Sequence, residues 1–113
     1  MEVGAGARET LGRAVQYHKE HLEIVTKAGD VRSQGRVCGS LGSIHCLQGE
    51  YQVAVEYYAQ RLQTDIQLGD ADTLRRTYVN LANTHLCLRQ YSKAVEYYQQ
   101  AMLLAQQLSL IHI

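Results

Sequence analysis

The sequence predicts an all-α protein, a solenoid of antiparallel helix pairs with about two and a half repeats. Three observations predict this fold. The pentapeptide AVEYY occurs at residues 54–58 and again at 94–98, and self-similarity at a period of roughly 20–50 residues is typical of solenoids. Apolar residues recur at helical spacing inside each repeat. The chain also lacks proline, which favours uninterrupted helices.

The repeat extends along most of the chain. Residues 51–70 and 91–110 are identical at nine of 20 aligned positions, and the two segments that come before residue 51 continue the same register. We therefore predict the following organisation: 1–10 disordered or a partial helix, 11–30 the second helix of a truncated repeat, 31–70 a full repeat, 71–107 a full repeat, and 108–113 a non-repeat tail.

Each repeat contains two predicted helices. Their expected spans are about 11–28, 32–48, 52–68, 72–88 and 92–107.

The first two helices are separated by a Gly-Asp turn. In the first, Val15 and Leu22 align with apolar residues of the later repeats. Gly29 is expected to end this helix in a left-handed conformation, and Asp30 is expected to cap the next one. In that second helix, Val37 and Leu41 lie four residues apart on one apolar stripe that continues to position 44.

The remaining three helices follow the same scheme. Gly49 marks the turn before the third helix. The apolar stripe of that helix consists of Ala54, Val55, Tyr58, Leu62 and Ile66. Gly69 and Asp70 repeat the Gly-Asp turn and begin the fourth helix. The fifth contains the second copy of AVEYY.

Composition excludes several classes of function. The chain has 11 basic and 11 acidic residues, so no charge excess points to nucleic acid or to an anionic membrane. No apolar run approaches the roughly 20 residues of a membrane span, and the N-terminus does not read as a signal peptide. The three cysteines, Cys38, Cys46 and Cys87, lack CxxC spacing. We therefore predict a cytoplasmic protein without disulfides.

The pattern of small and apolar residues resembles the tetratricopeptide repeat family. The matching positions that pack the helices of a repeat together in that family are Leu41, Gly42, Ala54, Tyr58, Leu81, Ala82, Ala94 and Tyr98. The recurring small residue at Ala101 also matches, whereas the family's usual proline is missing. The resemblance implies a right-handed superhelix with the first helix of each pair lining a concave groove.

The long period and the Gly-Asp turns resemble the Pins-type polarity and spindle-orientation scaffolds. The Leu-Gly-Asn motif of that subgroup becomes Leu-Gly-Ser at residues 41–43 and Leu-Ala-Asn at 81–83. This resemblance implies a scaffold or adaptor that binds partner peptides, in cell polarity, spindle orientation or G-protein signalling.

A polar ladder repeats in the first helices. Its members, at i, i+4 and i+7 in each repeat, are Arg36, Ser40, Ser43, Arg76, Asn80 and Asn83. Asparagine can satisfy an extended peptide backbone as donor and acceptor, and arginine can bind a carboxylate through two hydrogen bonds. The ladder therefore predicts a peptide-binding groove; the alternative is an ordinary solvated face.

Other candidate sites favour structural roles. A small-residue stripe at i, i+4, i+7 and i+11 predicts close helix packing, with a hinge as the alternative. Its members are Gly35, Gly39, Gly42 and Cys46. His45 and His85 occupy equivalent positions, about one interhelical distance apart, which is too far for shared zinc ligation. The sequence predicts no metal, no cofactor and no enzyme activity.

The two ends depart from the repeat. Residues 108–113, LSLIHI, resemble the translation of a transposase end sequence used in preparing sequencing libraries; they are either such a gene-model scar or a short apolar tail. We expect a fragment of a longer array with exposed apolar ends. A second hypothesis for function is therefore self-association or assembly through those ends.

Overall fold

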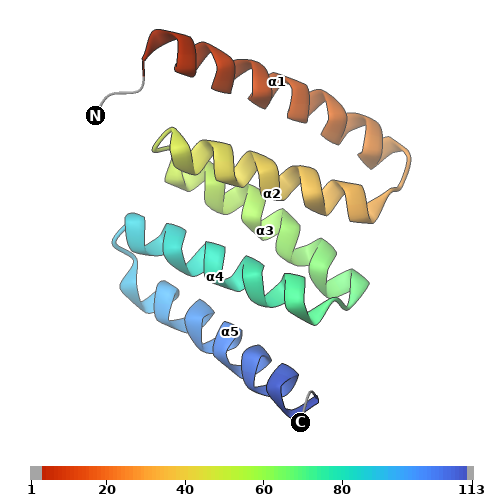
Figure 1. The fold of residues 1–113 in the computed structure, drawn as a ribbon, viewed down its shortest axis with the longest axis vertical. Helices are drawn as coiled ribbons and strands as arrows, with labels where there is room; N and C mark the ends of the chain where they lie inside the picture. The colour runs from red at the N-terminus through yellow and green to blue at the C-terminus, as the bar shows by residue number, and fades with distance from the viewer. Residues whose placement is uncertain (1–3, 112–113) are drawn as a thin grey trace.

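In the computed structural model, which describes residues 4–111, the chain forms a stack of α-helices (Figure 1). They are α1 (Ala5–Lys27), α2 (Val31–Leu47), α3 (Tyr51–Leu68), α4 (Ala71–Cys87) and α5 (Tyr91–Ile111). No strand occurs within these described residues. The predicted all-α fold is confirmed.

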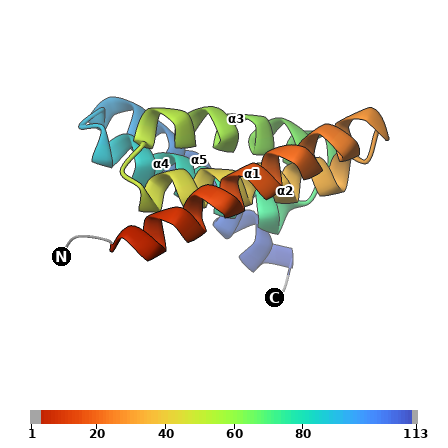
Figure 2. The ribbon, with the colours of Figure 1, turned by 90° about the horizontal axis from the view of Figure 1, so that it is seen from above.

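The helices follow one another along the long axis of the molecule, each antiparallel to the one before (Figure 1). The close packing is between chain neighbours, and the pairs α2–α3 and α4–α5 pack most extensively. Seen along the stack, α3 lies above α2, and the two end helices α1 and α5 cross in projection (Figure 2). Successive helices are therefore rotated relative to one another, as in a superhelix.

The turns between helices use the predicted residues. Gly29 and Gly69 adopt the left-handed conformation with φ of 71° and 69°, which glycine tolerates without a Cβ penalty. The carboxylate of Asp30 accepts a hydrogen bond from the Ser33 amide at 3.1 Å, and Asp70 accepts one from the Thr73 amide at 3.2 Å. Both predicted caps are confirmed.

The outer helices are longer than the sequence predicted. Helix α1 begins at Ala5 instead of residue 11, because the first break in its helical backbone is the extended Gly4. Glu9, in this added part, forms an ion pair at 2.7 Å with Arg13, one helical turn later. Helix α5 continues past residue 107 to Ile111. The rest of each terminal segment lies outside the described residues.

The core lies between the paired helices. Leu41, Ala54 and Leu81 have no exposed surface, and Ala82 and Ala94 are equally buried. Gly42 and Tyr58 are also buried. Tyr98 is only half-buried, because it lies on the last helix, which no further described helix covers.

The predicted apolar stripe of α3 was wrong at its end. Ile66 is 53% exposed, and Asp65 is buried in its place. A helix turns about 100° per residue, so each step of four residues moves a stripe about 40° around the axis. By Ile66 the stripe has rotated away from α4, and the face that points inward is that of Asp65.

Candidate protein-binding groove

Four of the six ladder residues line one hollow on the surface of α2 and α4. Arg36, Ser40 and Ser43 come from α2, and Asn80 comes from α4. The hollow is open to solvent and has a volume of about 600 Å³. The rest of its lining consists of Gly39 and Ile44 of α2 together with His18 and Arg61 from neighbouring helices. These four ladder residues, which were predicted to share one face of their helices, therefore lie on one common surface.

The other two ladder residues lie outside this hollow. Arg76 is exposed and forms an ion pair with Asp72, one turn earlier on α4, at 2.9 Å. The same carboxylate also holds Arg75 at 3.1 Å. Asn83 is exposed, and its Oδ1 accepts a hydrogen bond from the hydroxyl of Tyr98. One repeat earlier, Ser43 and Tyr58 form the equivalent hydrogen bond at 3.0 Å.

The glycine stripe of α2 lets side chains of α3 approach closely. A Cβ at Gly42 would lie 2.7 Å from the ring of Tyr58, and a Cβ at Gly35 would lie 2.4 Å from the Thr64 hydroxyl oxygen. At Gly39 the nearest atom would be Nη1 of Arg61, at 2.5 Å. The geometry supports the packing interpretation of this stripe, because each glycine faces a side chain that fills its missing volume.

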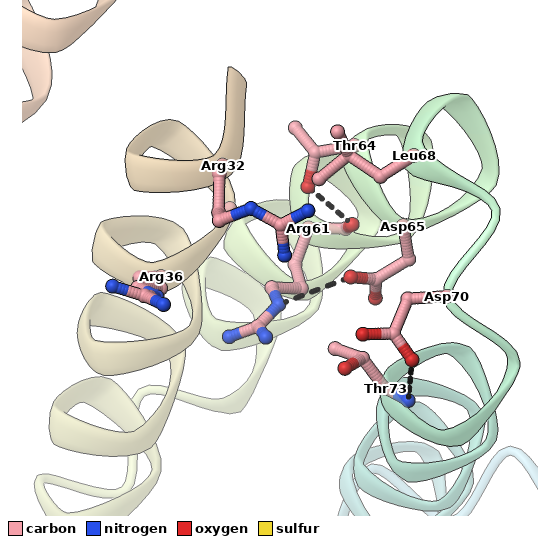
Figure 3. A pocket seen from close by; sticks show the side chains of 9 residues that line it. Arg32, Arg36, Arg61, Thr64, Asp65, Leu68, Asp70 and Thr73 are labelled. Atoms are coloured by element: carbon pink, nitrogen blue, oxygen red, sulfur yellow. Dashed lines mark hydrogen bonds and ion pairs between the residues drawn. The ribbon is translucent and has the colours of Figure 1, made fainter. Parts of the chain in front are cut away.

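Arg61 is a groove residue that the sequence analysis missed. Its side chain lines the hollow described above and also a second one, between α2, α3 and the start of α4 (Figure 3). Its Nε donates to Oδ1 of Asp65 at 3.3 Å. The sequence offered no repeating signal for it, since Ala101 stands at the equivalent position one repeat later.

Asp65 is buried, with 3% of its surface exposed, and its second oxygen accepts a hydrogen bond from the Thr77 hydroxyl. A buried carboxylate needs such partners to offset its lost hydration. Asp65 therefore joins α3 to α4 and at the same time holds the guanidinium of Arg61.

The paired histidines have structural partners. His45 Nδ1 lies 3.1 Å from Glu50 Oε1, and His85 Nδ1 lies 2.6 Å from Gln90 Oε1. Each imidazole also stacks on a tyrosine of the next helix, with 5.5 Å between ring centroids. These tyrosines are Tyr57 and Tyr97. Within the described residues, no three His, Cys, Asp or Glu side chains gather as metal ligands.

The buried cysteine is not set up as a nucleophile. Burial raises the pKa of the Cys38 thiol above its ordinary value, and the nearby Arg61 charge offsets this only in part. The reactive form of cysteine is the thiolate, so a raised pKa disfavours catalysis at neutral pH.

No described helix is long and apolar enough to cross a membrane.

Comparison with known proteins gives three findings. A family model for the tetratricopeptide repeat matches residues 38–107. Over 47 residues, 42% of this chain, the sequence is 43% identical to G-protein-signaling modulator 1 of Mus musculus and of Rattus norvegicus, and 40% identical to that of Homo sapiens. The match spans only 7% of the length of each of these relatives.

Among solved structures, the crystal structure of the TPR domain of Arabidopsis FLU is similar to this fold. Its TM-score is 0.78 at 20% sequence identity, and the alignment covers 86% of this chain and 82% of that one. This likeness establishes the architecture of stacked helix pairs and nothing about partners.

Proposed function

The chain belongs to the tetratricopeptide repeat family, and we propose that its surface along α2 and α4 binds extended peptide segments of partner proteins. The observation that carries this proposal is the hollow lined by Arg36, Ser40, Ser43 and Asn80. These residues come from two helices that lie in different repeats.

The chemistry of the hollow suits a peptide backbone. Asn80 can donate and accept hydrogen bonds at once, and Ser40 can do the same through its hydroxyl. An extended peptide exposes one donor and one acceptor per residue, which must be satisfied when it leaves water. The hollow is open rather than enclosed, so it favours a chain lying across it over a small molecule. We propose a binding role without catalysis.

We also infer that the chain belongs to a cytoplasmic scaffold or adaptor, in G-protein signalling, cell polarity or spindle orientation. The similarity to G-protein-signaling modulator 1 supports the first of these settings. Unpaired thiols at positions 38, 46 and 87 support a reducing compartment. Imaging of a fluorescent fusion in dividing polarised cells tests this inference; cortical enrichment agrees with it, and a secreted protein contradicts it.

Substitution in the ladder tests the groove directly. Peptides selected on the full chain by phage display provide the ligands. The double variant Arg76→Ala/Asn80→Ala should raise the dissociation constant of the selected peptides about tenfold, the effect of losing one or two hydrogen bonds of about 1 kcal/mol each. Most of this loss should appear already in Asn80→Ala, because Arg76 is paired with Asp72 in the free protein.

A matched control lies on α1. Arg13 and Gln16 are exposed on that helix and bond only to acidic residues one turn away. The variant Arg13→Ala/Gln16→Ala removes the same kinds of side chain and should bind the selected peptides like the original chain. Unchanged binding in the Arg76→Ala/Asn80→Ala variant, with its helical circular dichroism retained, would show that the groove is not the binding site.

A further inference from the structure

Another surface hollow lies on the opposite side of α4 from the α2–α4 hollow. Tyr78 lines it, whereas Asn80 lines the α2–α4 hollow. Residues two positions apart are about 200° apart around a helix, so these side chains leave α4 in nearly opposite directions. The hollow has a volume of about 560 Å³ and is lined from α3, α4 and α5. Helices α3 and α5 flank α4 in the stack (Figure 1).

A neighbouring hollow extends this one along α5. It has a volume of about 610 Å³ and reaches the turn before α5, where Arg89 and Tyr91 line it. Lys93 and Glu96 line both hollows. The two hollows therefore join into one open surface feature, which we call the α4–α5 channel.

Aromatic rings form much of the wall of the α4–α5 channel. The ring of Tyr97 stacks on that of Tyr78, with 6.0 Å between centroids, and on that of His85, with 5.5 Å. Tyr91 adds a ring whose residue is 58% exposed. Because stacking already holds three of these rings, a ligand that packs against them has fewer side chains to order on binding.

The polar groups of the channel are mainly unused hydrogen-bond donors. Four of its side chains form no hydrogen bond to another described residue, namely Tyr78, Tyr97, Gln99 and Gln100. The ammonium group of Lys93 lies over the Tyr97 ring, 5.8 Å from its centroid. All five side chains can donate. A ligand that only accepts hydrogen bonds would satisfy these donors without adding N–H groups of its own that need acceptors.

The charges of the channel nearly cancel. Arg89 and Lys93 are positive, and Glu96 is negative. Glu96 forms no ion pair with a described residue. A strongly charged ligand of either sign would therefore meet a group of its own sign, so the channel favours an uncharged ligand.

We propose that the α4–α5 channel binds an uncharged, proline-rich segment of a partner protein in the polyproline II conformation. Proline has no backbone N–H, and the carbonyl groups of this helix make no internal hydrogen bonds. Proline-rich segments of this kind bind in grooves lined by aromatic side chains.

The spacing of the tyrosines suits such a ligand. Tyr91 and Tyr97 are separated by six residues of α5, which is about 9 Å along the helix axis. Three residues, or one turn, of a polyproline II helix also span about 9 Å. Successive turns of the ligand can therefore meet successive rings.

The chemistry of the channel is specific to its repeat. One repeat earlier, the positions of Tyr78, Lys93 and Gln99 carry a cysteine, a valine and an alanine. That repeat thus lacks the first ring, the ammonium group and one of the amide donors. The proposal concerns a different surface and a different ligand from the peptide groove, and it does not depend on the proposed function.

Nonaproline tests the channel without a known partner. The ¹⁵N-labelled full chain is titrated with acetyl-nonaproline amide, which is uncharged and forms a polyproline II helix. The mirror-image peptide, built from D-proline, has the same composition and the opposite hand, and it is the control. We expect saturable shifts of the Gln99 and Gln100 side-chain amide signals with the L form and no saturable shifts with the D form.

Three variants sharpen the test. Tyr91→Ala/Gln99→Ala should raise the dissociation constant of L-nonaproline about tenfold, because it removes a ring and a donor; both residues are exposed, so the fold is retained. Tyr97→Phe keeps the ring but loses the hydroxyl and should raise the constant about threefold. Tyr17→Ala/Gln16→Ala, the matched control, removes the same kinds of exposed side chain from α1 and should leave the affinity unchanged.

Absence of saturable shifts with L-nonaproline, equal titrations with the two mirror forms, or unchanged affinity in Tyr91→Ala/Gln99→Ala would overturn the proposal. The variant Asn80→Ala keeps the channel and the groove apart. It should bind L-nonaproline like the original chain. A loss of affinity in this variant would place the ligand in the α2–α4 hollow and would also overturn the assignment to the channel.

Discussion

Arg89 occupies, in the turn between α4 and α5, the position that Gly49 holds one repeat earlier. Its φ is 60°, and that of Gly49 is 77°. Both residues therefore end a helix in the left-handed conformation, which costs an L-residue with a side chain roughly 1–2 kcal/mol. The packing of α5 on α4 holds Arg89 in this conformation in spite of that cost.

Relief of this strain gives a prediction at the residue scale. Arg89→Gly should raise the free energy of unfolding by about 1 kcal/mol, because glycine adopts a positive φ readily. Urea denaturation followed by circular dichroism measures it. The reverse substitution, Gly49→Arg, is the matched control and should destabilise the chain, since open space surrounds Gly49 and only the backbone is strained. A less stable Arg89→Gly variant would contradict the assignment.

At the scale of the element, α2 and α4 begin with the same kind of N-cap, an aspartate. Hydrogen bonds to Ser33, first from its side chain and then from its backbone, lower the pKa of Asp30. The backbone amide of Thr73 is the largest cause of the lowered pKa of Asp70. A carboxylate with a lowered folded-state pKa stabilises the fold above its unfolded pKa, and this contribution is lost as the pH falls through the folded value.

The caps at Asp30 and Asp70 therefore predict that the fold loses part of its stability as the pH falls. Between pH 7 and pH 2.5, the melting temperature of the chain should fall, and it should fall less in the variant Asp30→Asn/Asp70→Asn. Asparagine also caps helices but carries no titrating group, so the comparison isolates the charge. Glu23→Gln, on the exposed face of α1, is the control. Parallel pH profiles for the double variant and the original chain would refute the role of these two carboxylates.

At the scale of the whole molecule, the two ends of the stack differ from its middle. On α5, Tyr91, Val95 and Met102 are 58%, 52% and 56% exposed. The residues at the equivalent positions of α3 are half-buried, and two of them, Val55 and Leu62, pack against the core cluster that contains Leu81 of α4. The same apolar face is thus covered inside the stack and uncovered at its end.

This uncovered face favours the second functional hypothesis, association with another copy of the chain. We predict a concentration-dependent increase of the weight-average mass in sedimentation equilibrium, because apolar surface on α5 would leave water. Val95→Lys/Met102→Lys should abolish the increase. Lys19→Met, which alters an exposed residue of α1, serves as the control. A monomer at every concentration would contradict the self-association hypothesis.

Much of the fold was readable from the sequence because its signals are local. The caps at Asp30 and Asp70, the glycine turns and the number of helices depend on backbone preferences that act within a few residues. The spacing of Arg36, Ser40 and Ser43 placed them on one face for the same reason. Even the boundary errors, at the start of α1 and the end of α5, concern how far a local preference extends.

Only the tertiary structure decided what happens between helices. Arg61 enters the hollow because Gly39 lies opposite, and Asp65 is buried because Thr77 of the next repeat satisfies it. Ile66 is exposed because the inward face of α3 rotates along the helix. Each outcome depends on a neighbour from another helix, and contacts of that kind follow from how the helices pack, which a repeat pattern within one helix does not contain.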